Sequence, residues 1–149
     1  MKKQTAMRLL AVIISVVTAT MSVSAQNGLN IAKVFDRYGH SKGCRMVEMN
    51  NTELQGHKLR VYKSLTYKRI GKSVEAILKE DRRHARKIRE VVDEGQIVSG
   101  YYMMPAHDDG TNRFILFSKD YWNNGAVIYM EGNLSADDVM KICYTRKKR

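Results

Sequence analysis

The chain has 149 residues, of which 44% are hydrophobic and only one is proline, and its formal net charge is +11. This length suits one ordinary domain, and this composition excludes a disordered or low-complexity chain. Two cysteines are too few for a small scaffold held together by disulfides. The charge first suggests a nucleic-acid binder, but the N-terminal sequence argues against that class.

The first 25 residues have the pattern of a secretory signal peptide. Lys2, Lys3 and Arg8 give a positive start, an apolar run follows, and Val23-Ser24-Ala25 supplies the short side chains at which a signal peptidase cuts. An uncleaved anchor is the alternative, but the apolar run is about half the roughly 20 residues that a spanning helix needs. We therefore expect export to the periplasm or beyond. The mature chain, residues 26–149, is expected to form one domain without a membrane span and with a basic C-terminal tail.

Three stretches of the mature chain have helical spacing. Apolar residues recur over residues 28–38, and Gly39 is expected to end that helix in a left-handed conformation. Residues 71–95 form the longest stretch. Asp81 interrupts its apolar stripe, which favours a short helix to about residue 78 and a longer one over residues 80–94 that ends at Gly95. Ser135 is expected to cap the last helix, which opens with an acidic pair.

Five short runs have the patterns typical of strands, over residues 44–49, 59–68, 97–104, 113–118 and 126–130. Asn50-Asn51 and Gly56 mark an expected turn region between the first two runs. Lys63 breaks the inner face of the second run, which suggests a bulge or an edge position. The fourth run is apolar on both faces, which indicates a central strand covered on both sides or a face used in association.

Strands and helices do not alternate strictly along the chain, so a parallel doubly wound sheet is not expected. The short connections between the last three strands favour an antiparallel meander. The pattern therefore predicts an α+β domain, with an antiparallel sheet of about five strands packed with three helices.

Four stretches taken together resemble a known group of proteins. They are Val34-Phe35-Asp36-Arg37-Tyr38-Gly39, the run from Glu80 to Tyr102, Asn112-Arg113-Phe114-Ile115-Leu116-Phe117, and Ile128-Tyr129-Met130-Glu131-Gly132-Asn133-Leu134. The group is that of small exported proteins of Bacteroides-type bacteria, which form families of unknown function. The resemblance implies an exported single α+β domain, and it supplies no established catalytic residues.

The two cysteines, Cys44 and Cys143, are the first candidate site. An oxidising compartment permits a disulfide between them. Both also sit in apolar patterns, and the alternative is two small buried hydrophobic residues. The absence of a Cys-x-x-Cys motif argues against a redox enzyme.

A basic run is the second candidate, on the expected helix over residues 80–94. Its cations could bind anionic lipid headgroups or an acidic glycan, and they are Arg82, Arg83, Arg86, Lys87 and Arg89. The alternative is an ordinary solvated face, because acidic residues such as Glu80 and Glu90 are interspersed. Nucleic acid is excluded by the expected compartment rather than by charge.

Two loop segments are the remaining candidates. His107 and Asp108 have metal-capable side chains, but no further ligand has matching spacing, and turn chemistry explains this segment adequately. Tyr121 and Trp122 could stack on a sugar or contact a partner, although the interpretation we favour folds Trp122 over the sheet edge as a cap on the core.

The sequence contains no arrangement of catalytic residues that we recognise and no phosphate-binding glycine loop. It therefore predicts a non-catalytic exported domain, without metal or cofactor, that binds an envelope protein or an anionic surface component. One alternative is a peripheral binder of anionic lipid or glycan through the basic run. Another is an envelope hydrolase with His107 and Asp108 in a concave site.

Overall fold

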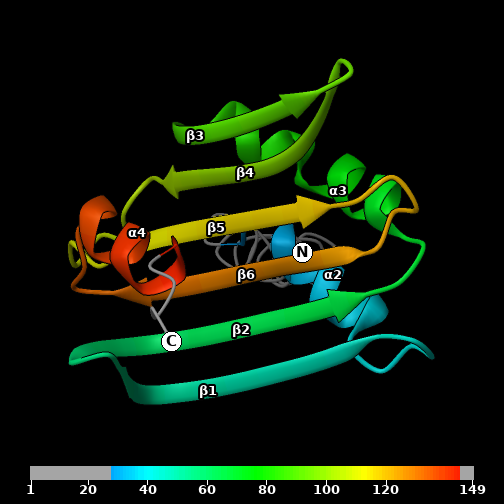
Figure 1. The fold of residues 1–149 in the computed structure, drawn as a ribbon. Coiled ribbons are helices and arrows are strands. Elements are labelled where there is room, and N and C mark those ends of the chain that lie inside the picture. The colour runs from blue at the N-terminus through cyan, green and yellow to red at the C-terminus, as the bar shows by residue number, and fades with distance from the viewer. Residues whose placement is uncertain (1–27, 145–149) are drawn as a thin grey trace, which may run out of the picture.

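The computed structural model of the chain describes residues 28–144, and Figure 1 shows their arrangement. The expected signal peptide over residues 1–25 and the basic end of the chain at residues 146–149 lie outside the described residues. The described part consists of one six-stranded antiparallel sheet and three helices. The predicted α+β class is therefore confirmed, with six strands in place of about five.

The helices and strands have the following bounds. The helices are α2 (Ile31–Tyr38), α3 (Gly71–Arg83) and α4 (Ala136–Tyr144). The strands are β1 (Arg45–Leu54), β2 (His57–Tyr67), β3 (Arg86–Asp93), β4 (Gln96–Met104), β5 (Asn112–Lys119) and β6 (Gly125–Gly132). Their order in the sheet is β1-β2-β6-β5-β4-β3, so that the pairing of β2 with β6 joins the first hairpin to a four-stranded meander.

The sixth strand, β3, lies where the sequence predicted a helix over residues 80–94, and that prediction is wrong. Ile88, Val91 and Val92 have helical spacing, but they belong to a strand that pairs with β4 along its whole length. The hairpin turn between β3 and β4 requires positive φ angles, which are 48° at Glu94 and 76° at Gly95. Gly95 thus makes a strand turn instead of ending a helix.

The helices cover both faces of the sheet. In Figure 1, α4 lies in front of the sheet, while α2 and α3 lie behind it. One core lies between the sheet and α2 and α3, and its largest members include Phe35, Tyr67 and Tyr102. A second core lies under α4. Strand β5 is central and contributes alternate residues to both cores, which confirms a strand covered on both sides.

Asp81 interrupts the apolar stripe of α3 without breaking the helix. Its side chain is only 4% exposed and accepts hydrogen bonds from the backbone N–H groups of Asn30 and Ile31, both at 2.8 Å. A carboxylate on α3 thereby caps the first turn of α2, where a negative charge also suits the helix dipole. The expected division of this segment into two helices at Asp81 is therefore wrong.

Two local predictions in the first half of the chain are corrected. Gly39 has φ −57° and is right-handed. Glycine is needed there for space, because a Cβ would lie 2.5 Å from the carbonyl oxygen of Phe35. Of the residues expected to mark the turn between the first two strands, Asn50 and Asn51 lie inside β1. Gly56 does lie in the turn, which comes at Gln55-Gly56, where both φ angles are positive.

Lys63 makes neither a bulge nor an edge. Strand β2 lies between β1 and β6, and its irregularity falls between Leu59 and Val61. The ammonium of Lys63 lies 3.4 Å from a carboxylate oxygen of Glu48 and 5.6 Å from the centre of the Phe35 ring. This partly covered cation has partners on the face that α2 occupies.

Candidate functional site

The five cations of the predicted basic helix lie on two elements and on both faces of the sheet. Arg82 and Arg83 end α3, whereas Arg86, Lys87 and Arg89 lie on β3. Lys87 faces α3 together with Arg82 and Arg83. The expected single helical face is therefore wrong, and the chain builds a different basic surface.

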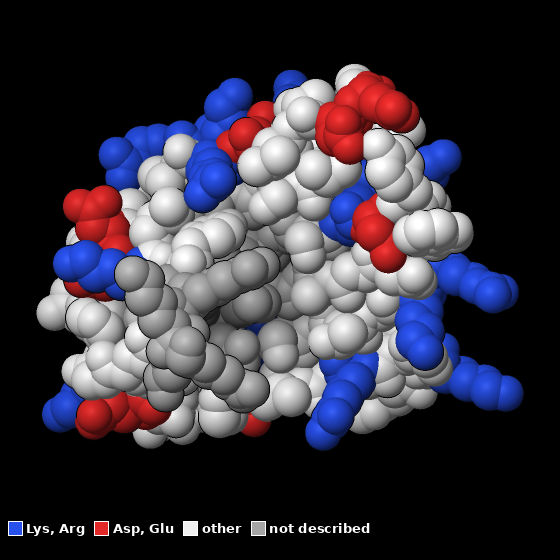
Figure 2. Space-filling model, in the orientation of Figure 1, with Lys and Arg blue, Asp and Glu red and all other residues white. Residues whose placement is uncertain are grey.

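Arg86 and Arg89 lie on the α4 face. The guanidinium of Arg86 donates to the sulfur of Met103, and that of Arg89 lies 5.5 Å from the ring centre of Tyr144. Figure 2 shows this face, with Lys and Arg side chains at its upper left, near β3, and along its right-hand edge.

On the α3 face, a groove runs between α3 and the hairpin of β3 and β4. It consists of two hollows of about 520 and 380 Å³ that share Lys79 and Arg82. Two carboxylates, Glu75 and Glu90, face six cations, which are Lys72, Lys79, Arg82, Arg83, Lys87 and Lys119. We name this surface the basic groove.

The two carboxylates of the basic groove are each shared between two cations. Glu75 lies 3.0 Å from Lys119 and 3.9 Å from Arg82. Glu90 lies 3.7 Å from Arg82 and 3.5 Å from Lys87. A third acid, Glu80, lies beside the groove and pairs with Arg83 at 3.3 Å. Six cations against three acids still leave an excess of positive charge.

Other cations of the basic groove have few or no acidic partners. Within residues 28–144, the exposed side chains of Lys72 and Lys79 make no ion pair. The Nε of Arg82 is buried and has no hydrogen-bond partner in the same part of the chain. The exposed ammonium groups of Lys72 and Lys79 are therefore accessible to an anion from outside.

Tyr102 forms part of the wall of the basic groove. Its hydroxyl donates to Glu90 at 2.8 Å, and the Arg82 guanidinium lies 5.7 Å from its ring centre. Burial, followed by the bond to Glu90, raises the pKa of the Tyr102 hydroxyl far above its ordinary value. The phenol is therefore a neutral donor that holds Glu90 in place.

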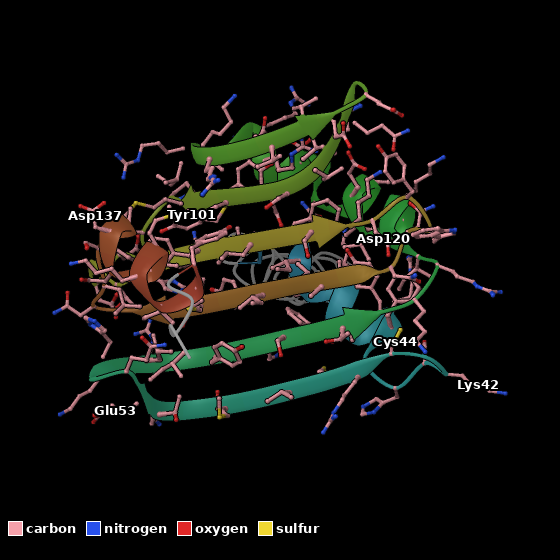
Figure 3. The ribbon with its side chains drawn as sticks, in the orientation of Figure 1. Lys42, Cys44, Glu53, Tyr101, Asp120 and Asp137 are labelled. Carbon is pink, nitrogen blue, oxygen red and sulfur yellow. The ribbon has the colours of Figure 1, made fainter. Side chains whose placement is uncertain are left out.

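The aromatic pair Tyr121-Trp122 lies at one end of the groove, on the turn that joins β5 to β6. Trp122 is 73% exposed and Tyr121 is 62% exposed, so the expected role of Trp122 as a cap on the core is wrong. The turn is ordered by the carboxylate of Asp120, which accepts from the backbone N–H groups of Trp122 and Asn124, both at 2.9 Å. Figure 3 labels Asp120 at this end of the sheet.

Two hydrogen bonds place this turn beside the groove. The carbonyl of Asn123 accepts from the N–H of Gly71, at the start of α3. The hydroxyl of Tyr121 donates to Asp93 at 2.6 Å, next to the turn between β3 and β4. The turn that carries Trp122 is thus attached to both walls of the groove, three residues after the groove cation Lys119.

A second charged cluster lies at the other end of this face, around Glu131. This carboxylate is only 8% exposed. It accepts from the hydroxyl of Tyr129 at 2.6 Å and from the Nε of Arg60 at 3.1 Å, and it contacts the Nε2 of His107 at 2.5 Å. Arg60 also reaches Asp109 at 2.8 Å. We name these five side chains the Glu131 cluster.

The pKa of Glu131 shows that its partners outweigh its burial. Burial alone raises this pKa, but the bonds from Tyr129, His107 and Arg60 bring it below its ordinary value. Bonds from Thr111 and Arg60 likewise hold the pKa of Asp109 well below its usual range. Both acids are therefore ionised at neutral pH, and their partners lie within the molecule.

Three members of the Glu131 cluster, His107, Tyr129 and Glu131, line a cavity of about 270 Å³ whose other wall is the apolar side of α2. Sequence reasoning named His107 and missed Glu131. The available signal was the pair Tyr129 and Glu131, two residues apart on one strand and hence on one face.

His107 and Asp108 do not converge as the hydrolase alternative requires. His107 lies against Glu131, whereas Asp108 is exposed on the turn that follows. Across residues 28–144, no three or more His, Cys, Asp or Glu side chains group in a way that could hold a metal ion.

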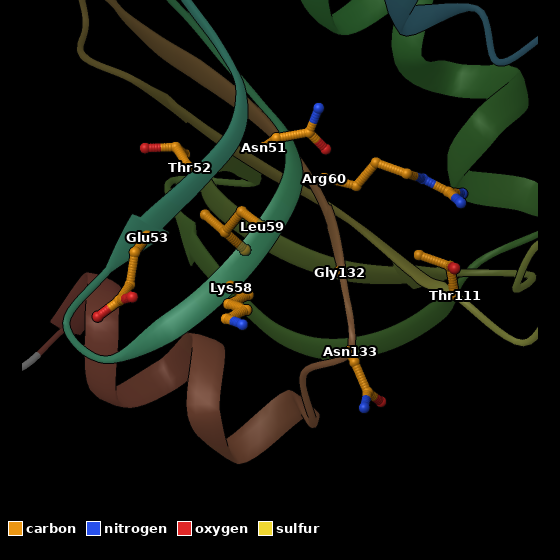
Figure 4. A pocket seen from close by; sticks show the side chains of 9 residues that line it. All are labelled: Asn51, Thr52, Glu53, Lys58, Leu59, Arg60, Thr111, Gly132 and Asn133. Carbon is orange, nitrogen blue, oxygen red and sulfur yellow. The ribbon is translucent and has the colours of Figure 1, made fainter.

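A further hollow lies on the β1–β2 side of the sheet, and most of the side chains around it are polar. It measures about 490 Å³ and is lined by residues of β1, β2 and the segment after β6. Figure 4 shows Glu53 and Arg60 pointing away from each other there. Arg60 turns instead to Asp109 and Glu131, so no set of reactive groups converges in this hollow.

The two cysteines are free thiols on opposite sides of the sheet. Cys44 packs against the core under α2 and α3, and Cys143 against the core under α4. Burial raises the pKa of the Cys143 thiol to about 11, so that it stays protonated at neutral pH. The disulfide does not form in this structure, and both residues act as small packed hydrophobes.

The chain belongs to a family of unknown function, DUF6108, which matches residues 18–143. No curated protein and no solved structure matches the chain. None of the helices within residues 28–144 is long and apolar enough to cross a membrane.

Proposed function

We propose that this protein is an exported, non-catalytic binding module of the cell envelope, and that the basic groove binds an anionic component of that envelope. The observation that carries the proposal is the excess of cations along the groove, where six positive side chains face two carboxylates. The proposal of export rests on the signal-peptide pattern of residues 1–25.

Two of the groove cations differ from those of an ordinary solvated face. Lys119 is buried in the groove floor, and Arg82 is partly covered, with side chains that are 4% and 23% exposed. Like charges held close together in a concave and partly desolvated surface repel one another. An anion that enters the groove relieves this repulsion, whereas a convex face would leave the same charges screened by water.

The contacts of the groove also favour binding over catalysis. Glu90 and Glu75 are engaged with cations, and Tyr102 donates to Glu90. Each potential acid or base on this surface already has a partner, and the remaining free groups are cations. Cations of this kind bind phosphates, sulfates and carboxylates without any further chemistry.

Binding to anionic surfaces tests the proposal. The protein secreted from the full chain is mixed with phosphatidylglycerol vesicles and with polygalacturonate, each at low and high salt. Phosphatidylcholine vesicles and dextran serve as neutral controls. We expect binding to at least one of the two anions, no binding to either neutral control, and loss of binding at high salt.

Two double variants locate the surface. Lys72→Glu with Lys79→Glu changes two exposed helix residues that have no ion pair, and we expect it to weaken binding by about tenfold or more. Arg86→Glu with Arg89→Glu makes the same change in net charge on the α4 face, and we expect less than about a threefold loss. Equal losses for both variants would show that net charge, and not the groove, governs binding. Failure of the unmodified protein to bind either anion would refute the proposal.

A further inference from the structure

We propose that the ligand of the basic groove is an acidic polysaccharide, a chain of sugars that carry carboxylates, and that Trp122 stacks on one of its sugar rings. This inference rests on the proposed function and narrows it to one class of ligand. Three observations carry it: the shape of the groove, the spacing of its cations and the position of the exposed indole.

The shape of the groove suits a chain better than a flat surface. Its two hollows adjoin along α3, and the stretch from Lys72 to Arg83 spans about 17 Å at the rise of an α-helix. Lys119 lies on the floor of this depression with its side chain only 4% exposed. A bilayer surface is wide and flat and would meet only the rims, whereas a single extended polymer can reach the floor.

The cations on the helix are arranged in a line. Lys72, Lys79 and Arg83 are seven and four residues apart, which places them on the same side of α3. The helical rise separates their Cα atoms by about 10 and 6 Å along the groove. A row of spaced cations matches a ligand whose negative charges repeat along its length.

The exposed aromatic side chain points to sugar rings as the units of that ligand. The Trp122 indole is 73% exposed, and the hydrogen bonds of the Asp120 turn fix its backbone at the end of the groove. The C–H faces of a pyranose ring are apolar and weakly positive, and they pack on the negative face of an indole. A polyphosphate or an acidic peptide backbone offers no comparable flat apolar surface.

The immobilised turn adds to the case for stacking. Tyr121 donates to Asp93, and Asn123 accepts from Gly71, so the turn is attached to both walls of the groove. Little conformational freedom of the backbone is lost when a ligand binds there, which favours affinity. Because this turn adjoins the groove, a chain that extends beyond the end of the groove passes beside Trp122.

The chain contains a single tryptophan, which makes its fluorescence a direct report of this contact. The secreted protein is titrated with oligogalacturonate, with polyglutamate of matched charge and with phosphatidylglycerol vesicles, while tryptophan emission and affinity are both measured. We expect oligogalacturonate to shift the emission of Trp122 and polyglutamate to bind more weakly without a shift.

Variants at Trp122 separate stacking from charge. Trp122→Ala is expected to lower affinity for oligogalacturonate by about three- to tenfold and to leave affinity for polyglutamate unchanged. Trp122→Phe, which keeps a flat ring, is expected to retain most of the affinity. Circular dichroism checks that both variants are folded, as expected for a side chain exposed to this degree.

The outcomes distinguish this inference from the proposed function. Equal affinity for the two polyanions, with no shift in emission, would overturn the polysaccharide inference and leave the anion-binding groove standing. A shift that only the vesicles produce would identify a lipid surface as the ligand and would also overturn it. If no polyanion and no anionic vesicle binds, both proposals fail.

Discussion

The basic groove and the Glu131 cluster lie on the same face of the sheet, and they use charge in opposite ways. In the cluster, one buried carboxylate is in contact with three side chains, from Tyr129, Arg60 and His107. In the groove, two carboxylates each form ion pairs with more than one cation, and the cations outnumber them. The charges of the cluster are paired with one another, whereas the groove keeps an excess of positive charge that can bind a ligand.

This difference indicates which charges stabilise the fold and which are available for binding. A buried acid whose partners are all internal ties together the elements that supply them, and here these are β2, β6 and the loop after β4. An exposed cation without a partner contributes little to stability. Substitutions in the two regions should therefore affect different properties of the protein.

The largest expected effect on stability concerns Asp81, a third acid with internal partners. Asp81→Ala removes the acceptor for two backbone N–H groups of α2 and should destabilise the protein by about 3 kcal/mol. Urea denaturation followed by circular dichroism measures the loss. Asp36→Ala removes an exposed acid from α2 itself and should cost less than about 0.5 kcal/mol. Equal costs would contradict a capping role for Asp81.

Glu131→Gln is expected to have the next largest effect, because the amide keeps the shape of the side chain and loses its charge. The cost should be about 2 kcal/mol at pH 7, measured by urea denaturation. Affinity for an anionic ligand should stay unchanged. A marked loss of binding without a loss of stability would move the binding site to the cavity under α2.

The lowered pKa of Glu131 predicts that the stability of the protein depends on pH. The pKa of Glu131 is lower in the folded protein than its ordinary value of 4.5. Its contribution is therefore complete above about pH 4.5 and is lost as the pH falls through the folded value. Glu131→Gln lacks this contribution, so the difference in unfolding free energy between the two proteins should shrink on acidification from pH 7 to pH 3. A constant difference would contradict the assignment.

Glu90→Gln is the matched substitution in the groove and should have the smallest effect on stability. Glu90, like Glu131, accepts a tyrosine hydroxyl, and an amide oxygen can still accept it. We expect a cost below about 1 kcal/mol, since its ionic partners are partly solvated. Removal of one of the two groove acids should raise affinity for an anion about threefold in a binding titration. Weaker binding would contradict the view that this acid only offsets groove charge.

The sequence predicted the meander best, because its strands are rich in β-branched and aromatic residues and are separated by clear turns. It failed at β3 for a definable reason. Ile88, Val91 and Val92 are spaced as on one face of a helix, and the surrounding Arg, Lys and Glu residues favour helices. A bulge between Lys87 and Arg89 also disturbs the alternation that marks a strand. Only the pairing with β4 makes this segment a strand.

The candidate site was predictable in composition and not in geometry. The sequence identified Arg82, Arg83 and Lys87 as possible anion ligands, but it grouped them with two cations that lie on the opposite face. Lys72, Lys79 and Lys119 join the site only through tertiary packing, and no local pattern marks them. The exposure of Trp122 likewise depends on how its turn docks on the start of α3.

The most direct test of the basic groove as the binding surface is an NMR titration of the ¹⁵N-labelled protein with oligogalacturonate. We predict chemical-shift changes along α3, at Gln96 and Ile97 and at the indole N–H of Trp122. The signals of His107, Tyr129 and Glu131 should remain in place, because the partners of that cluster are internal. Shifts centred on the Glu131 cluster, with α3 and Trp122 unaffected, would contradict the assignment of the basic groove as the binding surface.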